Sequence, residues 1–151
     1  MTKLHFEDVR EGEIRELGSY RVSKDEMVAF AQRYDPQPIH VDESAAEASI
    51  YGGIIASGWY TAGVCMRLLV DGFLIDAASM GSFGLDELRW RAPVRPDDVI
   101  SVRNEIVDAR ESTSRDDRGY VKNELTARNQ DREEVLSWTA TNIFLRKNSN
   151  A

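Results

Sequence analysis

The chain has 151 residues, 42% of them hydrophobic and 30% charged, and a formal net charge of −7. This length suits one domain, which we assign to residues 1–151 with its folded part at about 10–147, and it is too short for two. The acidic balance disfavours nucleic acid and anionic membrane surfaces as partners, so an anionic ligand would need a local cluster of basic side chains.

The single cysteine and the two chain ends favour a reducing compartment. Cys65 lies among apolar residues and has no partner for an internal disulfide, so we expect a small buried hydrophobic side chain. Residues 1–8 lack the apolar run of a signal peptide, residues 148–151 match no targeting tail, and no stretch suits a bilayer crossing. We therefore expect a cytoplasmic protein with no membrane partner.

The first part of the chain predicts a strand followed by a helix. Apolar residues alternate loosely over residues 13–22, which indicates a strand with a bend at Gly18. Ser23 as N-cap and Glu26 three residues later form the pattern of a capping box, and the apolar residues that follow share one helical face. The helix must end before Pro36, which cannot continue it.

Two prolines stiffen the next segment, which reads Asp-Pro-Gln-Pro-Ile-His over residues 35–40. Proline fixes its own φ and keeps the preceding residue out of the helical region, so we expect a rigid loop that aims Asp35 and His40. A carboxylate and a neutral imidazole can share a water molecule, one accepting its proton while the other supplies a proton elsewhere. This pair could add water to an activated double bond. Alternatively, Asp35 caps a turn and His40 lies on the surface.

Two more helices are predicted after this loop. Asp42 can cap a short helix over residues 43–49, and Ser57 can cap a long one over residues 59–73. The long helix is apolar on most faces, which predicts burial. Gly58 would place an unobstructed backbone N–H at the positive end of the helix dipole, where it could stabilise negative charge on an oxygen. The alternative is a simple cap and a tight turn.

The rest of the chain is rich in extended segments. Short turns join them, and short turns imply antiparallel neighbours. Together with the first strand and the long helix, they predict an α+β domain in which one antiparallel sheet curls around one central helix. The predicted strands, read as a meander, are residues 83–90, 99–107, 120–129 and 135–145.

These residues resemble a known family, the MaoC-like dehydratases or (R)-specific enoyl-CoA hydratases, which have the hot-dog fold. The family motif has Asp, one residue, Asn, Pro, an aliphatic residue and His, and later a His-Gly that opens the central helix. The similarity covers residues 10–147 and includes an Arg- and Pro-rich stretch at 88–98. The matching residues are Asp35, Gln37, Pro38, Ile39, His40, Ser57 and Gly58.

The sequence departs from the family pattern at several positions near the motif. Gln37 replaces the usual Asn, and Ser57 replaces the His before the glycine. Tyr34 stands where many members have a small residue, and Gly63 where some have Ser. These departures leave the acid, the imidazole and the N–H in place, so they bear on substrate and pocket shape rather than on reaction type.

The resemblance implies an enzyme of acyl-CoA and fatty acid metabolism. Asp35 and His40 would position water for addition to a trans-2-enoyl-CoA, giving an (R)-3-hydroxyacyl-CoA, and Gly58 would polarise the thioester carbonyl. Such an enzyme needs no metal and no cofactor beyond the coenzyme A of its substrate, and it forms at least a homodimer. The predicted substrate-binding residues are Ile54, Ile55 and Trp59 for the acyl group and Arg89, Arg91 and Arg95 for the phosphates.

Three other functions remain open from the sequence. A hot-dog thioesterase would use the carboxylate to activate water against the carbonyl carbon. A non-catalytic acyl-CoA-binding subunit would use Asp35 and His40 only for capping and packing. A metal site formed by these two with Asp42 and Glu43 is disfavoured, because the chain has only two histidines and no spaced cysteines.

Overall fold

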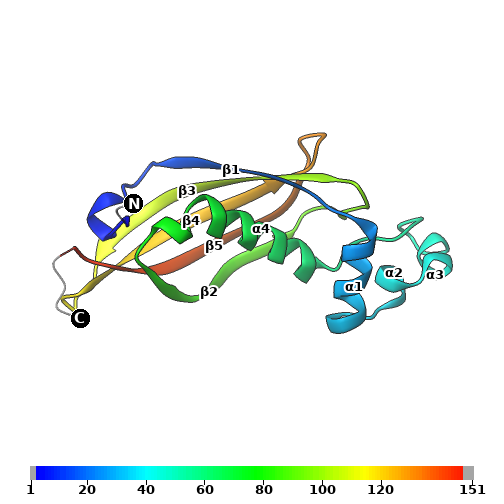
Figure 1. Ribbon diagram of the computed structural model, residues 1–151, viewed down its shortest axis with the longest axis horizontal. Helices are drawn as coiled ribbons and strands as arrows, with labels where there is room; N and C mark the ends of the chain where they lie inside the picture. Colours follow the sequence, from blue (N-terminus) through cyan, green and yellow to red (C-terminus); the bar gives the residue numbers. More distant parts are fainter. Residues whose placement is uncertain (1–2, 148–151) are drawn as a thin grey trace.

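A five-stranded antiparallel sheet curls around one long helix, α4, in the computed structural model of the protein (Figure 1). The structure describes residues 3–147, so residues 148–151 and the first two residues of the predicted domain lie outside it. The strands, in sheet order, are β1 (Ile14–Arg21), β3 (Val99–Glu111), β4 (Arg118–Arg128), β5 (Glu134–Leu145) and β2 (Ser79–Trp90). The helices are α1 (Lys24–Tyr34), α2 (Pro38–Val41), α3 (Glu43–Glu47) and α4 (Gly58–Gly72), with 3-10 turns at Phe6–Asp8 and Leu74–Asp76.

Helix α4 packs on the concave face of the sheet with one side only. Its buried residues recur at helical spacing and join alternating buried residues of β3, β4 and β5 in one apolar core. Burial keeps Cys65 inside this core and raises the pKa of its thiol to about 12. The opposite side of α4 leaves Trp59 and Met66 exposed, so the prediction of a helix buried on most faces is wrong.

Strand β2 corrects the predicted meander. It begins at Ser79, four residues before the predicted start, and pairs with β5, whereas β3 pairs with β1 and β4. Only β3, β4 and β5 therefore form a meander. The segment of residues 91–98, which the sequence predicts to connect neighbouring strands, instead carries the chain from the edge strand β2 past β5 and β4 to β3, next to the opposite edge strand β1. We call it the crossing segment.

Backbone hydrogen bonds hold the crossing segment at its C-terminal end and in its middle. Val22 N–H donates to Asp98 O at 2.9 Å, which fixes the segment to the end of β1. Ala56 N–H donates to Val94 O at 2.8 Å, which fixes its middle beneath the residues that precede α4. The crossing segment thus closes one end of the molecule, next to the N-terminus of α4 and the short helices α1 to α3 (Figure 1).

The bend predicted at Gly18 is present as a bulge in β1. The register with β3 shifts between Glu16 and Ser19, and Gly18 has a φ of +87°, a conformation that glycine adopts without steric cost.

Within residues 3–147, none of the helices combines the length and the apolar composition that crossing a membrane requires.

Candidate active site

Helix α1 delivers Asp35 to the site as its C-terminal cap. Its N-terminus is capped as predicted, with Glu26 N–H donating to Ser23 Oγ at 3.2 Å. The second half of the predicted capping box is absent, because the Glu26 carboxylate accepts the hydroxyls of Tyr20 and Tyr60 instead, each at 2.5 Å. These two hydrogen bonds lower the pKa of Glu26 and tie α1 to β1 and α4.

Part of the loop predicted over residues 35–40 is helical. Pro38 is the first residue of a one-turn helix, α2, where its fixed φ and missing N–H fit the N-terminal position. His40 lies in this turn and is 6% exposed, so the alternative of a surface histidine is wrong. His40 Nδ1 lies 2.8 Å from Ile55 O, which holds the ring toward the residues that precede α4.

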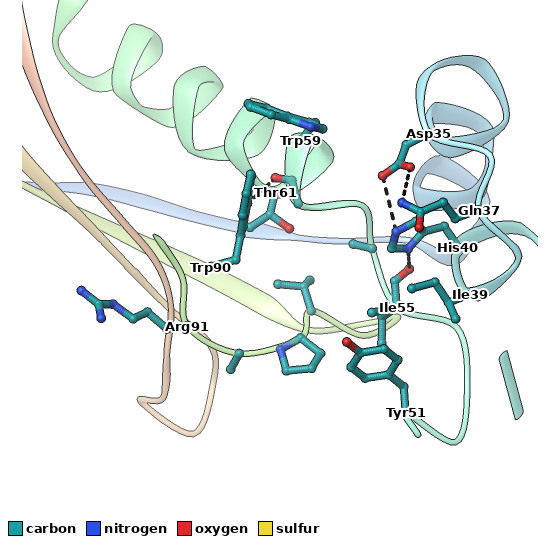
Figure 2. Close-up of a pocket in the computed structure, with 15 residues that line it drawn as sticks. Asp35, Gln37, Ile39, His40, Tyr51, Ile55, Trp59, Thr61, Trp90 and Arg91 are labelled. Carbon is teal, nitrogen blue, oxygen red and sulfur yellow. Dashed lines mark hydrogen bonds and ion pairs between the residues drawn. The ribbon is translucent and has the colours of Figure 1, made fainter. Parts of the chain in front are cut away.

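Asp35 and His40 face each other at the centre of the site, with Asp35 Oδ2 3.4 Å from His40 Nε2 (Figure 2). Gln37 Nε2 donates to Asp35 Oδ1 at 2.8 Å, and Ser57 Oγ donates to Asp35 Oδ2 at 2.7 Å. These donors, Gln37 first and then Ser57, hold the pKa of Asp35 below its ordinary value. Asp35 is therefore an anion at neutral pH.

The contact with Ile55 decides the tautomer of His40. A carbonyl oxygen can only accept, so Nδ1 carries the proton and Nε2 of the neutral ring is an acceptor. Nε2 and Asp35 Oδ2 are then two acceptors that face the same small space. Their natural partner is a molecule with two O–H donors, and water is the smallest of these.

Gly58 opens α4 beside this pair. Within residues 3–147 its N–H has no hydrogen-bond acceptor, as is usual in the first turn of a helix. The Trp90 indole lies against the Cα of Gly58. A Cβ at this position would lie 2.4 Å from Trp90 Cε2, and Trp90 Nε1 donates to Gly58 O at 2.8 Å.

A cavity of about 460 Å³ joins these groups. Of the residues predicted for the site, Asp35, His40, Gly58, Ile55, Trp59 and Arg91 line it. The other three lie elsewhere: Ile54 packs in the core, Arg89 pairs with Glu87 at 2.9 Å, and the Arg95 guanidinium lies beside Gly53.

Sequence reasoning missed several residues of the cavity wall, among them Trp90, Tyr51 and Thr61. Trp90 packs edge-to-face on Trp59 with ring centroids 5.1 Å apart, Tyr51 lies on the opposite side, and Thr61 lines the cavity beside Trp90 (Figure 2). Thr61 is 3% exposed. Thr61 lies four residues after Ser57, about one helical turn, and this spacing indicates that it faces the same side of α4. The positions of Trp90 and Tyr51 depend on tertiary packing, and no local pattern indicates them.

Asp42 and Glu43, which a metal site with Asp35 and His40 would require, are engaged elsewhere. Asp42 accepts from Ala45 N–H as the N-cap of α3, and Glu43 pairs with Lys24. In the part of the chain that the structure describes, no three His, Cys, Asp or Glu side chains are grouped to hold a metal ion.

One antiparallel sheet around a central helix, with an acid and an imidazole at the helix N-terminus, places the protein in the hot-dog class. Residues 7–129 match the model of the MaoC like domain. The chain therefore belongs to the MaoC-like family of hydratases and dehydratases.

Two curated proteins are similar to parts of the chain. It is 34% identical to the 3-hydroxybutyryl-CoA dehydratase of Methylorubrum extorquens over 106 residues, 70% of this chain and 65% of that protein. It is 36% identical to the uncharacterized protein YdeM of Bacillus subtilis over 98 residues, 64% of this chain and 69% of that one. The matches thus span about two thirds of these curated relatives.

The similarity to a solved structure extends over almost the whole chain. The crystal structure of a MaoC-like dehydratase from Rhodospirillum rubrum superposes with a TM-score of 0.89 and 37% identity, covering 97% of this chain and 99% of that one. The R-hydratase PhaJ1 of Pseudomonas aeruginosa shares the fold, with a TM-score of 0.75, 16% identity and coverage of 99% and 94%.

Proposed function

We propose that the protein adds water across the double bond of a trans-2-enoyl-CoA to give an (R)-3-hydroxyacyl-CoA, or catalyses the reverse dehydration. The observation that carries this proposal is the pair of facing acceptors, Asp35 Oδ2 and His40 Nε2, 3.4 Å apart beside the free N–H of Gly58. Membership of the family and the relative from Methylorubrum extorquens that is named a 3-hydroxybutyryl-CoA dehydratase support it.

The geometry suits a general acid–base mechanism. Water held between Asp35 and His40 attacks C3 of the enoyl group and gives its proton to His40 Nε2, while the C2–C3 π electrons move toward the thioester oxygen. The Gly58 N–H, at the positive end of α4, stabilises that developing oxyanion. The proton then passes to C2, so that the atoms of one water molecule are added. The Asp35 anion offsets the charge of the transient imidazolium.

We propose that the acyl group is short or branched and that coenzyme A is held near Arg91. Ile55, Trp59 and Trp90 form apolar walls close to the acid and the imidazole, and the two indoles restrict the space beyond them. Arg91 lines the cavity and contacts only the neutral Ser137 hydroxyl at 3.2 Å among the described residues, so its charge is available for a phosphate. Arg89, by contrast, already has a carboxylate partner.

We further propose a homodimer in which the β2 strands of two copies pair. β2 lies at the edge of the sheet, where its outer backbone groups can template pairing with another strand. Its side chains include an apolar series that is unusually exposed for a monomer, namely Met80 (60%), Phe83 (69%), Leu85 (43%) and Trp90 (45%).

A panel of trans-2-enoyl-CoA esters of different length and branching, followed by the enoyl absorbance, tests the reaction. The native chain should hydrate the short esters, and Asp35→Asn should lower kcat by about 10²- to 10⁴-fold, the range for one acid–base group. Release of free CoA with no change in enoyl absorbance would identify a thioesterase instead. Turnover that survives both Asp35→Asn and His40→Gln would assign the two residues a purely structural role.

A further inference from the structure

We infer that Ser57 is a positioning residue for the reaction. Its hydroxyl fixes the position of the Asp35 carboxylate relative to the N-terminus of α4. The catalytic meaning of this inference rests on the proposed function. The geometry itself does not, because it concerns only how this chain fixes one carboxylate.

The Ser57 hydroxyl has two fixed hydrogen-bond roles. Ser57 is completely buried, and its Oγ lies 2.7 Å from Asp35 Oδ2 and 3.3 Å from Trp59 N. The Trp59 N–H can only donate, so it uses an Oγ lone pair, and the single hydroxyl proton is left for Asp35. One side chain thus caps the helix and orients the acid, across 22 positions of sequence.

This arrangement links the two groups that the mechanism requires. Gly58, which offers the N–H to the thioester oxygen, follows Ser57 directly, and Asp35 Oδ2 is the oxygen that faces His40 Nε2. A shift of Ser57 would therefore move the water-binding pair relative to the oxyanion site. Such misplacement lowers catalysis steeply even when every reacting group is still present.

The donated proton also favours the charged form of Asp35. Ser57 on one oxygen and Gln37 on the other are neutral donors, and His40 is the titratable group that faces the carboxylate. Removing the Ser57 donor should raise the pKa of Asp35 toward its ordinary value. A role limited to helix capping would leave this pKa unchanged.

The test uses three variants of the full chain. Ser57→Gly removes the hydroxyl at a position where glycine is a tolerated N-cap, and Ser57→Thr restores it. Ser23→Gly is the matched control, because Ser23 caps α1 in the same way and does not touch Asp35. The readouts are kcat/KM for the best enoyl-CoA ester and the titration midpoint of the Asp35 carboxyl carbon by ¹³C NMR, with Asp35→Asn assigning the signal.

We expect Ser57→Gly to lower kcat/KM about ten-fold or more and to raise the Asp35 midpoint, with both changes reversed in Ser57→Thr and absent in Ser23→Gly. An unchanged midpoint in folded Ser57→Gly would overturn the inference. If the native chain hydrates no ester but the midpoint still rises, the proposed function fails, whereas the placement of Asp35 by Ser57 stands.

Discussion

His40 is oriented by a backbone carbonyl, and this choice determines what its other nitrogen can do. Because Nδ1–H donates a hydrogen bond to Ile55 O, Nε2 of the neutral ring is left as an acceptor that faces the Asp35 anion. The carbonyl belongs to the segment just before α4, so the imidazole is held by the stretch of backbone that leads into the helix N-terminus. At the scale of single residues, the site is therefore a set of hydrogen bonds with fixed direction.

Replacing His40 tests the role of Nε2. We expect His40→Gln to lower kcat by about 10²- to 10⁴-fold, because glutamine can still donate to Ile55 O but cannot accept and return a proton. Steady-state kinetics with an enoyl-CoA ester measures this effect. The control is His5→Gln, since His5 lies in the N-terminal arm and does not line the cavity. Full activity in His40→Gln would rule out the imidazole as the base.

The lowered pKa of Asp35 predicts a pH dependence of stability. A carboxyl group whose pKa is lower in the folded than in the unfolded chain stabilises the fold above its unfolded pKa, and this contribution is lost as the pH falls through the folded pKa. Below about pH 4, the free energy of unfolding of the native chain should fall more steeply than that of Asp35→Asn. Urea unfolding at stepped pH measures both slopes, and equal slopes would contradict the prediction.

The close approach of Trp90 to Gly58 predicts a steric coupling. A methyl group at residue 58 would overlap the indole, so Gly58→Ala should cost about 1–3 kcal/mol of stability and lower kcat/KM. Trp90→Leu in the same chain should recover most of the lost stability, because the obstruction is removed. A double-mutant cycle by chemical unfolding checks this. Additive effects of the two substitutions would show that the indole is not the obstacle.

The residues of the site differ in how far the sequence could predict them. Asp35 and His40 lie five positions apart on a stiffened segment, so local geometry alone brought them together. The hydrogen bond from Ser57 to Asp35 spans the α2–α3 region, and Trp90 reaches Gly58 from a distant strand. Such contacts depend on how whole elements pack, and no local pattern contains that information.

At the scale of elements, α1 is anchored through Glu26. Its carboxylate accepts the hydroxyls of Tyr20 in β1 and Tyr60 in α4, and burial together with this hydrogen bond raises the pKa of Tyr60. The anchor fixes the helix whose C-terminal cap is Asp35. The position of Asp35 therefore depends on a contact nine residues earlier, near the other end of α1.

Removing this anchor should weaken both stability and activity. In Glu26→Ala the buried Tyr60 hydroxyl loses its acceptor, so we expect a loss of about 1–3 kcal/mol and a lower kcat/KM. Chemical unfolding and steady-state kinetics measure the two effects. Asp25→Ala is the control, because it removes an acidic residue from the same turn without touching either tyrosine. A similar loss in Asp25→Ala would point to the helix dipole instead.

The elements themselves were largely predictable, and their connection was not. Alternating apolar residues gave β3, β4 and β5, and capping residues gave the starts of α1, α3 and α4. The crossing segment is short, and a short connection predicts that the two strands it joins are neighbours in the sheet. Its eight residues are nevertheless long enough, when extended, to span the end of the sheet, and a local pattern does not say which strand edge is free.

At the scale of the whole molecule, the edge of the sheet formed by β2 is suited to pairing with another chain. The exposed apolar side chains of β2 and its free backbone groups lie together along this edge. A second copy would cover both. One curled sheet around one helix followed from the sequence, but the identity of the edge strand required the pairing of β2 with β5.

A charge on β2 should therefore disrupt the proposed dimer. We expect Phe83→Lys to convert the protein to a monomer at micromolar concentration, as measured by analytical ultracentrifugation. Ile50→Lys is the matched control, because Ile50 is 94% exposed but lies between α3 and α4, away from β2. A native chain that sediments as a monomer, or a dimer that persists in Phe83→Lys, would exclude this interface.

The crossing segment has a consequence for redesign of the protein. It joins the edge strand β2 to β3 across the end of the sheet and also supplies Arg91, Ala92, Pro93 and Val94 to the cavity wall. Loop grafting intended to change substrate preference would thus interfere with strand pairing unless the transplanted piece kept the original span. In this protein, the cavity wall and the chain topology depend on the same few residues.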